Sequence, residues 1–472
     1  MKERKPAVTN KVKIVMSDLH LGAGLAEQGN RLEDFTSHEP FAAFLGQLVE
    51  ESEETGTEME LILNGDCIEF LQVPAVTSYD PQRHYNPDAY RSSSEEAAVQ
   101  RTSLVTTGHS SLFGALRDFL KPASPRRYVT ILKGNHDVQL YWPAVKKALR
   151  QALGATGERA ELLTFHERCI SREGIYVEHG NQYAETGNRF QDFEEPLDPE
   201  DRSRLETPWG SRFMVEFFNE VEQERYWVDN VKPVQSLLWY SLAYDFPFAC
   251  RAILAFLKAL PRIIGLVPLT DEQVQTVESL IEELEDEGQR TALWRDYAED
   301  AAFRRDFQIR LQQAMALALP QAEEVPRPTW NLAGQLLPQE IARQIIREQD
   351  EALRKIADTI GREEGVEVVI FGHTHRPMQA AISSGVYINT GTWTWQVDYA
   401  NKSDEEWREL FEHPERFADE RTLSYARIEY DEEGHARAQL LEYPSEPSVA
   451  VPPLLSWWQR IWLFLRRLFL GD

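Results

Sequence analysis

The chain has 472 residues, of which 42% are hydrophobic and 11% aromatic, a composition that is typical of a folded protein and excludes wholesale disorder. Its length predicts two or three domain-sized units. The formal net charge of −27 lacks the cations that non-specific binding to a phosphate backbone requires, so we expect no nucleic-acid partner.

Cysteine content and the N-terminus bear on the compartment. Cys67, Cys169 and Cys250 are odd in number and include no CxxC pair, which argues against a disulfide framework and against a cysteine zinc site. The segment from Met1 to Lys11 is polar and charged and shows no secretory signal. We therefore expect a cytoplasmic protein.

The first elements along the chain predict a parallel βαβ unit. Val12 to Met16 alternates as a strand, Pro40 to Glu51 has the apolar spacing of a helix, and Leu61 to Leu63 reads as a second strand. Units of this kind collect functional groups at the carboxyl ends of their strands. Here the two strands lead into Asp18-Leu19-His20 and Gly65-Asp66.

The same alternation continues after a long loop. Residues 73 to 100 are rich in Pro, Ser, Asp and Tyr and predict a loop beside the site. Helical spacing at 104 to 120 and at 144 to 153 then alternates with strands at 128 to 132 and 175 to 177. These strands lead into Gly134-Asn135-His136-Asp137 and His179-Gly180.

Residues 185 to 360 predict a mostly helical insertion, because the segment is too long for a connection within a sheet. Its candidate helices are 213 to 228, 236 to 267, 271 to 300 and 339 to 360. We expect the last of these to pack on the sheet as the crossover into the next strand. The cationic apolar segment Phe248 to Leu269 fits either a lipid-facing surface or a buried helix pair.

Beyond the insertion, the run Val368 to Phe371 reads as a buried strand that leads into His373-Thr374-His375. Further strands at 386 to 389 and 424 to 430 suggest a second sheet. A proline-rich linker at 443 to 453 precedes the C-terminal tail.

The residues at the strand ends have the chemistry of metal ligands. Side chains at i and i+2 of an extended segment point the same way, so His373 and His375 present two imidazoles together. Each motif alone is more readily explained as a chance core histidine or a turn aspartate. Taken together they indicate a metal centre, because five of the eleven histidines fall in these motifs: His20, His136, His179, His373 and His375.

In chain order the motifs read Asp18-x-His20, Gly65-Asp66, Gly134-Asn135-His136-Asp137, His179-Gly180 and Gly372-His373-Thr374-His375. This series resembles the calcineurin-like metallophosphoesterase superfamily, whose pattern is D-x-H, GD, GNH(D/E), H and GHxH. The resemblance covers residues 11 to 184 and 361 to 442. It implies an α/β fold, a β-sandwich flanked by helices (αββα), with the insertion at 185 to 360 as a cap.

The resemblance also implies a dinuclear metal centre. It assigns one ion to Asp18, His20, Asp66 and His375 and a second ion to Asp66, Asn135, His179 and His373, so that Asp66 bridges the two. Mixed oxygen and nitrogen ligands without thiolate suit Mn²⁺ first, with Fe or Zn²⁺ as alternatives. The glycines Gly65, Gly134 and Gly372 permit the tight turns that such a site needs.

Two ions so placed would clamp phosphoryl oxygens and activate a water for in-line attack on phosphorus. His136 is not assigned to a metal and is the candidate general acid. Asp137 would orient the His136 imidazole or serve only as a turn residue. Arg376 is a candidate phosphate contact, with a solvated loop arginine as the alternative.

Within the superfamily, three segments look like the branch of UDP-2,3-diacylglucosamine hydrolases, which cleave a pyrophosphate in a lipid A precursor. These are Ser17-Asp18-Leu19-His20-Leu21, Gly65-Asp66-x-x-Glu69 and Gly372-His373-Thr374-His375-Arg376-Pro377. Those enzymes commonly carry arginine where this chain has His136, and this chain is much longer. The substrate of that branch is therefore not transferred.

The tail, Leu454 to Leu470, predicts an amphipathic helix. Its apolar residues recur at i, i+3, i+4 and i+7, and Arg460, Arg466 and Arg467 lie largely elsewhere on the helix. Seventeen residues with three arginines make a poor transmembrane span but fit a helix at the inner surface of a membrane. The alternative is a helix docked on the protein itself or on another copy.

The sequence thus predicts a hydrolase, a dinuclear-metal-dependent phosphoesterase that cleaves a phosphoester or pyrophosphate bond. Its substrate would be a phosphorylated small molecule or a lipid-linked, membrane-proximal compound. One alternative is a soluble nucleotide or cyclic-nucleotide phosphodiesterase. The other is a non-catalytic metal-binding scaffold, against which the complete ligand set and the intact His136 argue.

Overall fold

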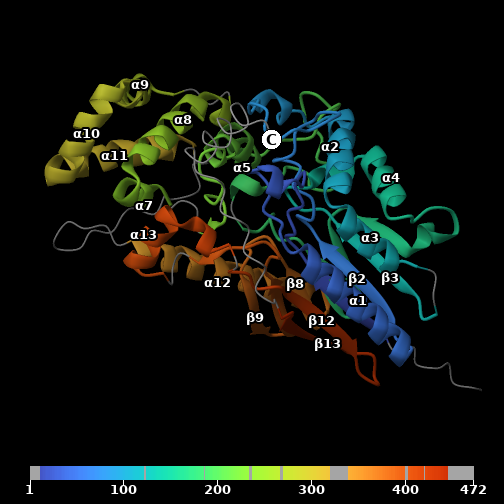
Figure 1. The fold of residues 1–472 in the computed structure, drawn as a ribbon. Helices are drawn as coiled ribbons and strands as arrows, with labels where there is room; N and C mark the ends of the chain where they lie inside the picture. Colours follow the sequence, from blue (N-terminus) through green and yellow to red (C-terminus); the bar gives the residue numbers. More distant parts are fainter. Residues whose placement is uncertain are drawn as a thin grey trace, which may run out of the picture.

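The computed structural model describes residues 11–121, 124–184, 186–232, 237–265, 269–318, 338–398, 402–418 and 420–444 (Figure 1). The predicted helix at 454–470 and most of the linker at 443–453 lie outside these residues. Two β-sheets face each other and helices cover their outer faces. The predicted α/β class with αββα layers is therefore the observed fold.

The first sheet has six strands in the order β13-β12-β1-β2-β3-β4. They are β1 (Lys11–Met16), β2 (Glu58–Asn64), β3 (Arg127–Leu132), β4 (Leu163–His166), β12 (Ser424–Tyr430) and β13 (Ala436–Glu442). Strands β1 to β4 are parallel, which confirms the predicted βαβ unit. The strand predicted at 424–430 belongs to this sheet and not to a second one, because it pairs antiparallel with the edge of β1 that β2 leaves open.

The second sheet has five strands in the order β5-β6-β8-β10-β9. They are β5 (Cys169–Arg172), β6 (Ile175–Glu178), β8 (Val368–Phe371), β9 (Pro377–Ile382) and β10 (Gly385–Thr390). Strands β6, β8 and β10 run parallel to one another. The carboxyl ends of β6 and β8 therefore lie at the same edge of this sheet.

Successive side chains along each strand point to opposite faces of the sheet, and this alternation separates the layers of the fold. On β1, Val15 points between the sheets and packs with Ile370 of β8, whereas Ile14 and Met16 point to the outer face. On β8, Val369 and Phe371 face outward into a separate cluster. Near-continuous apolar runs such as these are expected for strands that are buried on both faces.

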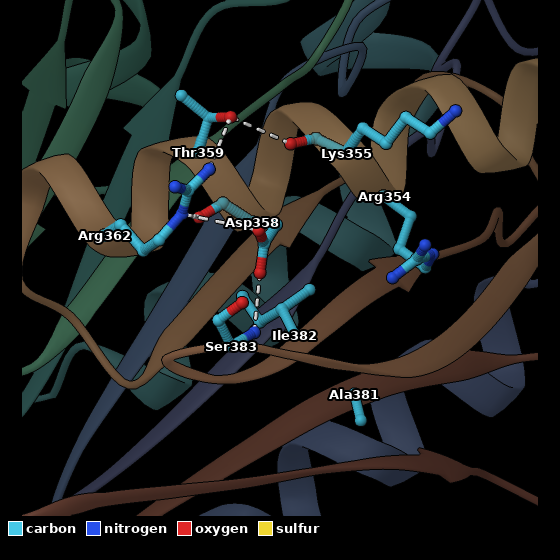
Figure 2. Close-up of a pocket in the computed structure, with 8 residues that line it drawn as sticks. All are labelled: Arg354, Lys355, Asp358, Thr359, Arg362, Ala381, Ile382 and Ser383. Carbon is cyan, nitrogen blue, oxygen red and sulfur yellow. Dashed lines mark hydrogen bonds and ion pairs between the residues drawn. The ribbon is translucent and has the colours of Figure 1, made fainter.

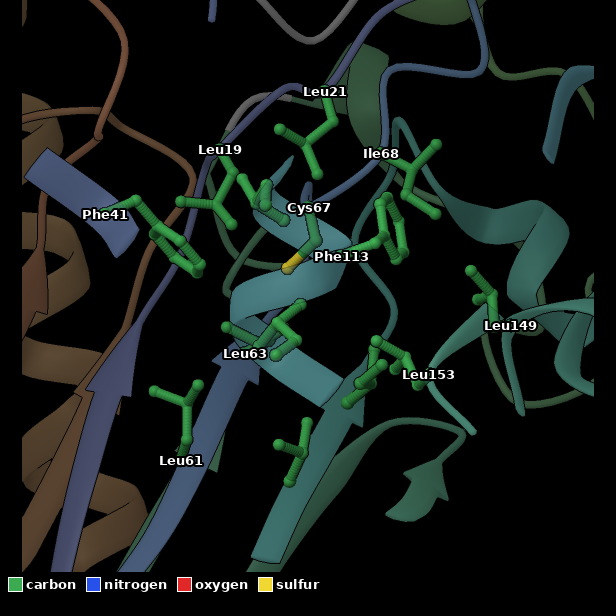
Figure 3. Close-up of a cluster of buried hydrophobic side chains, with 14 of the residues drawn as sticks. Leu19, Leu21, Phe41, Leu61, Leu63, Cys67, Ile68, Phe113, Leu149 and Leu153 are labelled. Atoms are coloured by element: carbon green, nitrogen blue, oxygen red, sulfur yellow. The ribbon is translucent and has the colours of Figure 1, made fainter. Parts of the chain in front are cut away.

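Four helices cover the outer face of the first sheet: α1 (His38–Thr55), α2 (Glu95–Gly108), α3 (Ser110–Phe119) and α4 (Pro143–Ala152). Figure 3 shows part of this core, in which Leu61 and Leu63 of β2 belong to the same cluster as Phe113 of α3. The helix predicted at 104–120 is in fact two helices. They break at His109, whose ring stacks on that of His38 and whose Nε2 contacts the carbonyl of Gly22.

The outer face of the second sheet is covered by α12 (Pro338–Glu364), the helix expected as the crossover into β8. Leu353 and Ala357 of α12 pack on Tyr387 and Val369. At the far end of α12, the Asp358 carboxylate accepts a hydrogen bond from the backbone N–H of Ser383 at 2.6 Å (Figure 2). This part of the predicted insertion thus belongs to the sandwich.

The first elements of the insertion lie against the core. It begins with α5 (Trp209–Phe213), a π-helical turn (Met214–Phe218) and α6 (Asn219–Glu222), so the helix predicted at 213–228 starts earlier and ends earlier than expected. Strand β7 (Val231–Lys232) then pairs with β11 (Val397–Asp398). Trp227 and Val228 pack against Trp407 of α13 (Asp404–Glu412), which joins the insertion to the segment after β10.

The remaining helices form a group to one side of the sheets (Figure 1). They are α7 (Leu237–Tyr244), α8 (Phe246–Ile264), α9 (Asp271–Glu285), α10 (Glu287–Glu299) and α11 (Ala301–Ala318), and the last of these was not predicted. The apolar face of α8 is buried among α9, α10 and α11, which favours the buried-helix interpretation of residues 248–269. In the described part of the chain, no helix combines the length and the apolar character needed to span a bilayer.

Candidate metal centre

The predicted site residues lie at the carboxyl ends of five strands, three from the first sheet and two from the second. Asp18 and His20 follow β1, Asp66 follows β2, Asn135, His136 and Asp137 follow β3, His179 follows β6, and His373 and His375 follow β8. The two sheets are joined here, because the backbone N–H of His373 donates to Asp18 Oδ2 at 3.0 Å.

Asp18, His20 and His375 form a first group that could hold a metal ion, with ligand atoms that all lie within 4.8 Å of one another. His20 Nε2 is 2.9 Å from His375 Nε2, and His375 Nε2 is 3.3 Å from Asp18 Oδ1. Two ring nitrogens at this separation require either a shared proton or a cation between them.

Asp66, His179 and His373 form a second group with the same spread. His179 Nδ1 is 2.9 Å from the carbonyl oxygen of Asn64, which can only accept, so this nitrogen carries the proton. Nε2 of His179 lies 3.0 Å from Asp66 Oδ2, and it presents a lone pair to a metal ion once it has given up its proton. A backbone carbonyl that fixes the tautomer of an imidazole in this way is usual for a metal-binding histidine.

The buried atoms without hydrogen-bond partners provide a test of whether these residues fit metal ions. They include Asp18 Oδ1, Asn135 Oδ1 and His179 Nε2, one atom from each of three predicted ligands. Buried polar atoms are normally paired, and an ion would satisfy all three. The residues present therefore fit the dinuclear centre that the sequence pattern implies. The bridging position predicted for Asp66 is not seen, because Asp66 groups with His179 and His373 and not with Asp18, His20 and His375.

Backbone strain is concentrated in the same residues. Among the described residues other than glycine, seven have positive φ, and five of these are predicted ligands: Asp18, His20, Asp66, His373 and His375, with φ between 45° and 70°. This left-handed conformation is disfavoured for residues with a Cβ and is found mainly where the surroundings impose it, as at functional sites.

Two glycines allow the loops to approach one another. A Cβ at Gly134 would overlap Asp66 Oδ1 and would lie 2.8 Å from His179 Cδ2. A Cβ at Gly372 would overlap Ser17 Oγ and would lie 2.7 Å from Asp18 Oδ2. Glycine is thus required at both positions by close packing against the candidate ligands.

Glu69 is a site residue that sequence reasoning used only as part of a branch motif. Its Oε2 atom lies 2.7 Å from His20 Nδ1 and 2.5 Å from His136 Nδ1, and these three side chains form a third group within 4.8 Å. The spacing Gly65-Asp66-x-x-Glu69 was the available signal, because it places a second carboxylate three residues beyond a ligand.

The orienting role considered for Asp137 therefore falls to Glu69. Asp137 Oδ2 accepts from the backbone N–H of Cys67 at 2.8 Å, and its Oδ1 accepts from Gly134. Asp137 is fully buried and ties the loop after β2 to the loop after β3. Of the two roles weighed for this residue, the structure favours the turn residue.

Arg376 is held by α12. Its guanidinium lies 2.6 Å from Asp350 and 3.3 Å from the Gln349 side chain. The phosphate contact considered for Arg376 would have to compete with this ion pair.

The charges of the centre stabilise one another. Burial opposes the charge on Asp18, but the neighbouring imidazoles of His20 and His375 hold the pKa of Asp18 well below its ordinary value. Despite burial, His136 and His20 lower the pKa of Glu69 to about 2. Against the same desolvation, Asp66 raises the pKa of His179 to about 9, and Glu69 and Asp66 raise the pKa of His136.

A groove of about 440 Å³ between α12 and the β9–β10 turn lies apart from this chemistry (Figure 2). Its cations are paired within α12, Arg354 and Lys355 with Glu351 and Arg362 with Asp358. None of the candidate ligands lines it. We therefore place the functional site at the strand ends and not in this groove.

Comparisons with known proteins complete the description. No protein-family model matches the chain, and no curated protein matches it. Among solved structures it is similar to a protein from Staphylococcus aureus provisionally described as a 5'-nucleotidase in complex with alpha-ketoglutarate. The two share 12% identity at a TM-score of 0.28, over 93% of this chain and 56% of that chain. The chain thus spans little more than half the length of that protein.

Proposed function

We propose that the protein is a phosphoester or phosphoanhydride hydrolase that works with two divalent metal ions. The observation that carries the proposal is the convergence of two ligand groups, Asp18–His20–His375 and Asp66–His179–His373, beside His136, which belongs to neither. Support also comes from the order of the motifs, which resembles that of the calcineurin-like metallophosphoesterases.

The two ligand groups would each hold one ion, with Asn135 adding its unpartnered Oδ1 to the second. When bound, such ions neutralise phosphoryl oxygens and supply a nucleophile at neutral pH. Mixed oxygen and imidazole ligands suit Mn²⁺, Fe or Zn²⁺. The protein's own contribution is to hold these ligands rigidly at strand ends, through backbone contacts such as that of His373 with Asp18.

His136 is placed to act as a general acid. Its Nδ1 atom contacts Glu69, which stabilises the protonated ring and leaves Nε2 to donate to a leaving oxygen. The His136 side chain is 16% exposed, more than that of any neighbouring carboxylate, so it can reach a substrate. Glu69 holds the ring in this orientation.

The proposal is tested by Mn²⁺-dependent hydrolysis of an aryl phosphomonoester, an aryl phosphodiester and an alkyl phosphodiester. We expect His136→Ala to lower kcat by about 10²- to 10⁴-fold on the alkyl ester, and less on the aryl esters, whose leaving groups need less protonation. His435→Ala removes an exposed histidine paired with Glu367 and should leave the rates unchanged. Equal rates for wild type and His136→Ala on all three esters would contradict the proposal.

The alternatives give different results in the same assay. A soluble nucleotide or cyclic-nucleotide phosphodiesterase would prefer nucleotide esters over lipid-linked pyrophosphates. A scaffold would bind metal without turnover of any of them, and Asp66→Ala would then abolish metal binding alone.

We further propose that residues 454–470 bring the enzyme to a membrane surface and to a lipid-linked substrate. The support is the amphipathic pattern of the segment, with tryptophans and arginines suited to a headgroup region. Sedimentation with anionic liposomes should recover the full chain and not a chain that ends at residue 453. Equal recovery of the two would exclude this role and favour docking on protein.

A further inference from the structure

The loop that carries His373 and His375 connects β8 to β9 and consists of residues 372–376. Both histidines have a positive φ, of 70° and 60° respectively. A residue with a Cβ adopts this conformation only at a cost, so the loop keeps its shape where other segments hold it. The contacts at the two ends of the loop therefore decide where the two imidazoles lie.

The core holds the first half of this loop. The Gly372 carbonyl accepts a hydrogen bond from Asn389 Nδ2 at 2.7 Å, and the backbone N–H of His373 donates to Asp18 Oδ2 at 3.0 Å. Asn389 belongs to β10, and Asp18 follows β1. These contacts fix the backbone at His373, two residues before His375.

The insertion holds the second half of the loop, through the side chain of Arg376. Helix α12 runs back along β8, so that its residues near position 350 reach the carboxyl end of that strand (Figure 1). Arg376 Nη2 lies 2.6 Å from Asp350 Oδ1 and 3.3 Å from Gln349 Oε1. The side chains of Arg376 and Asp350 are 19% and 29% exposed, so water screens this ion pair only in part.

The backbone of Arg376 is restricted as well. The next residue is Pro377, and a residue that precedes proline is confined to extended conformations. Pro377 opens β9 and pairs with Thr390 of β10. Because both its backbone and its guanidinium are held, Arg376 limits the positions that the preceding residue, His375, can take.

We propose that Asp350 is a positioning residue for the first ligand group, Asp18–His20–His375, and that it acts through Arg376. This inference rests on the proposed function, because it concerns the same metal centre. His375 Nε2 lies 3.3 Å from Asp18 Oδ1, and the ion pair with α12 holds the residue next to His375. The insertion thus supports the metal centre although it supplies none of the candidate ligands.

The alternative role for the ion pair is to stabilise the packing of α12 and nothing more. Removal of a purely stabilising pair would lower the free energy of unfolding and leave the affinities for both metal ions unchanged. Removal of a positioning pair should weaken the binding of one ion, the ion held by the group that contains His375. The selective loss of one ion therefore distinguishes the two roles.

Calorimetric titration of the full chain with Mn²⁺ measures this loss without any assay of activity. We expect Asp350→Ala to weaken one of the two ions by about 10- to 100-fold, as for other residues that orient metal ligands, and to leave the other ion unchanged. Glu351→Ala is the matched control. It removes the next carboxylate of α12, which pairs with Arg354 and Lys355, and should leave both affinities unchanged.

Two variants that each lack one ligand identify the ion that is affected. His373→Ala removes a ligand of the second group, and His375→Ala removes a ligand of the first group. Asp350→Ala should weaken the ion that remains in His373→Ala. It should have no effect on the ion that remains in His375→Ala.

A double-variant cycle tests whether Asp350 acts through Arg376. Arg376→Ala, and Arg376→Ala combined with Asp350→Ala, should both show the loss seen for Asp350→Ala alone, because the two residues form one contact. Thermal unfolding checks that each variant is folded. Asp350→Asn, which keeps the shape of the side chain, takes the place of Asp350→Ala if that chain does not fold.

Three results would overturn the inference and leave the proposed function intact. They are unchanged affinities for both ions in Asp350→Ala, an equal loss for both ions, and losses that add in the double variant. A wild-type chain that binds no Mn²⁺ would instead contradict the proposed function, and the inference with it.

Discussion

At the scale of single residues, the candidate centre depends on side chains and turns that tolerate little change. Gly134→Ala would force a Cβ into Asp66 Oδ1, which must then move. We expect Mn²⁺ affinity to fall by at least about tenfold, as for other changes that displace ligands, measured by calorimetric titration. Gly46→Ala is the matched control, because a Cβ there meets nothing within 4 Å on α1; it should leave Mn²⁺ binding intact.

Glu69→Gln tests the contact shared by His20 and His136. One carboxylate oxygen, Oε2, contacts both imidazole Nδ1 atoms, and Oε1 accepts from the backbone N–H of Leu71. The amide has no charge to strengthen the first two contacts, and its NH₂ group cannot accept the third, so both rings are held less firmly. We expect about 10- to 100-fold weaker Mn²⁺ binding and a lower kcat. An unchanged Mn²⁺ titration of activity would show that Glu69 does not support the centre.

The structure agrees with the predicted site residues wherever the motif alone determines their position at a strand end. Each ligand-type residue follows an apolar strand, and the strand ends of the two sheets meet so that Asp18, His20 and His375 form one group and Asp66, His179 and His373 form another. The contact of Glu69 with two histidines could not be predicted, because it depends on how the chain turns after Asp66. The ion pair of Arg376 with Asp350 likewise depends on where a distant helix packs.

At the scale of elements, α12 is the clearest case in which a helix of the insertion supports the core. Leu353 is 2% exposed and packs on the outer face of the second sheet. Leu353→Ala should lower the free energy of unfolding by about 2–5 kcal/mol through the cavity it leaves, measured by urea denaturation. Lys355→Ala, on the solvent side of the same helix, should change it by less than about 0.5 kcal/mol.

Strands and helices with a strong apolar period were predictable, and the exceptions have physical causes. The helix at 104–120 breaks because His109 bonds across to the loop after β1, a contact between distant segments. Residues 424–430 were correctly predicted as a strand, but their sheet was not, since pairing with β1 is decided by which strand edge stays open. α11 carries too weak a periodicity to be recognised before its partners α8 and α9 are known.

At the scale of the whole molecule, binding of metal is coupled to protons. In the metal-free protein Asp66 raises the pKa of His179 to about 9 against the effect of burial, and Asp18 and Glu69 raise the pKa of His20 above its ordinary value. A ligating histidine must give up its proton, and the apparent Mn²⁺ affinity should therefore fall as pH decreases, by about tenfold per unit for each proton displaced. Calorimetry in buffers of different ionisation enthalpy measures this number directly; a heat that is the same in every buffer would contradict the assignment.

The central claim is that one chain holds two metal ions at the ends of its strands, and it is tested most directly by counting them. Protein loaded with Mn²⁺ and freed of excess metal is analysed by elemental mass spectrometry, as wild type and as Asp66→Ala. The ligand groups predict about two ions per chain for the wild type and a clear loss for the variant. A wild type without bound Mn²⁺, Fe or Zn²⁺, or an Asp66→Ala chain that retains two ions, would contradict the account.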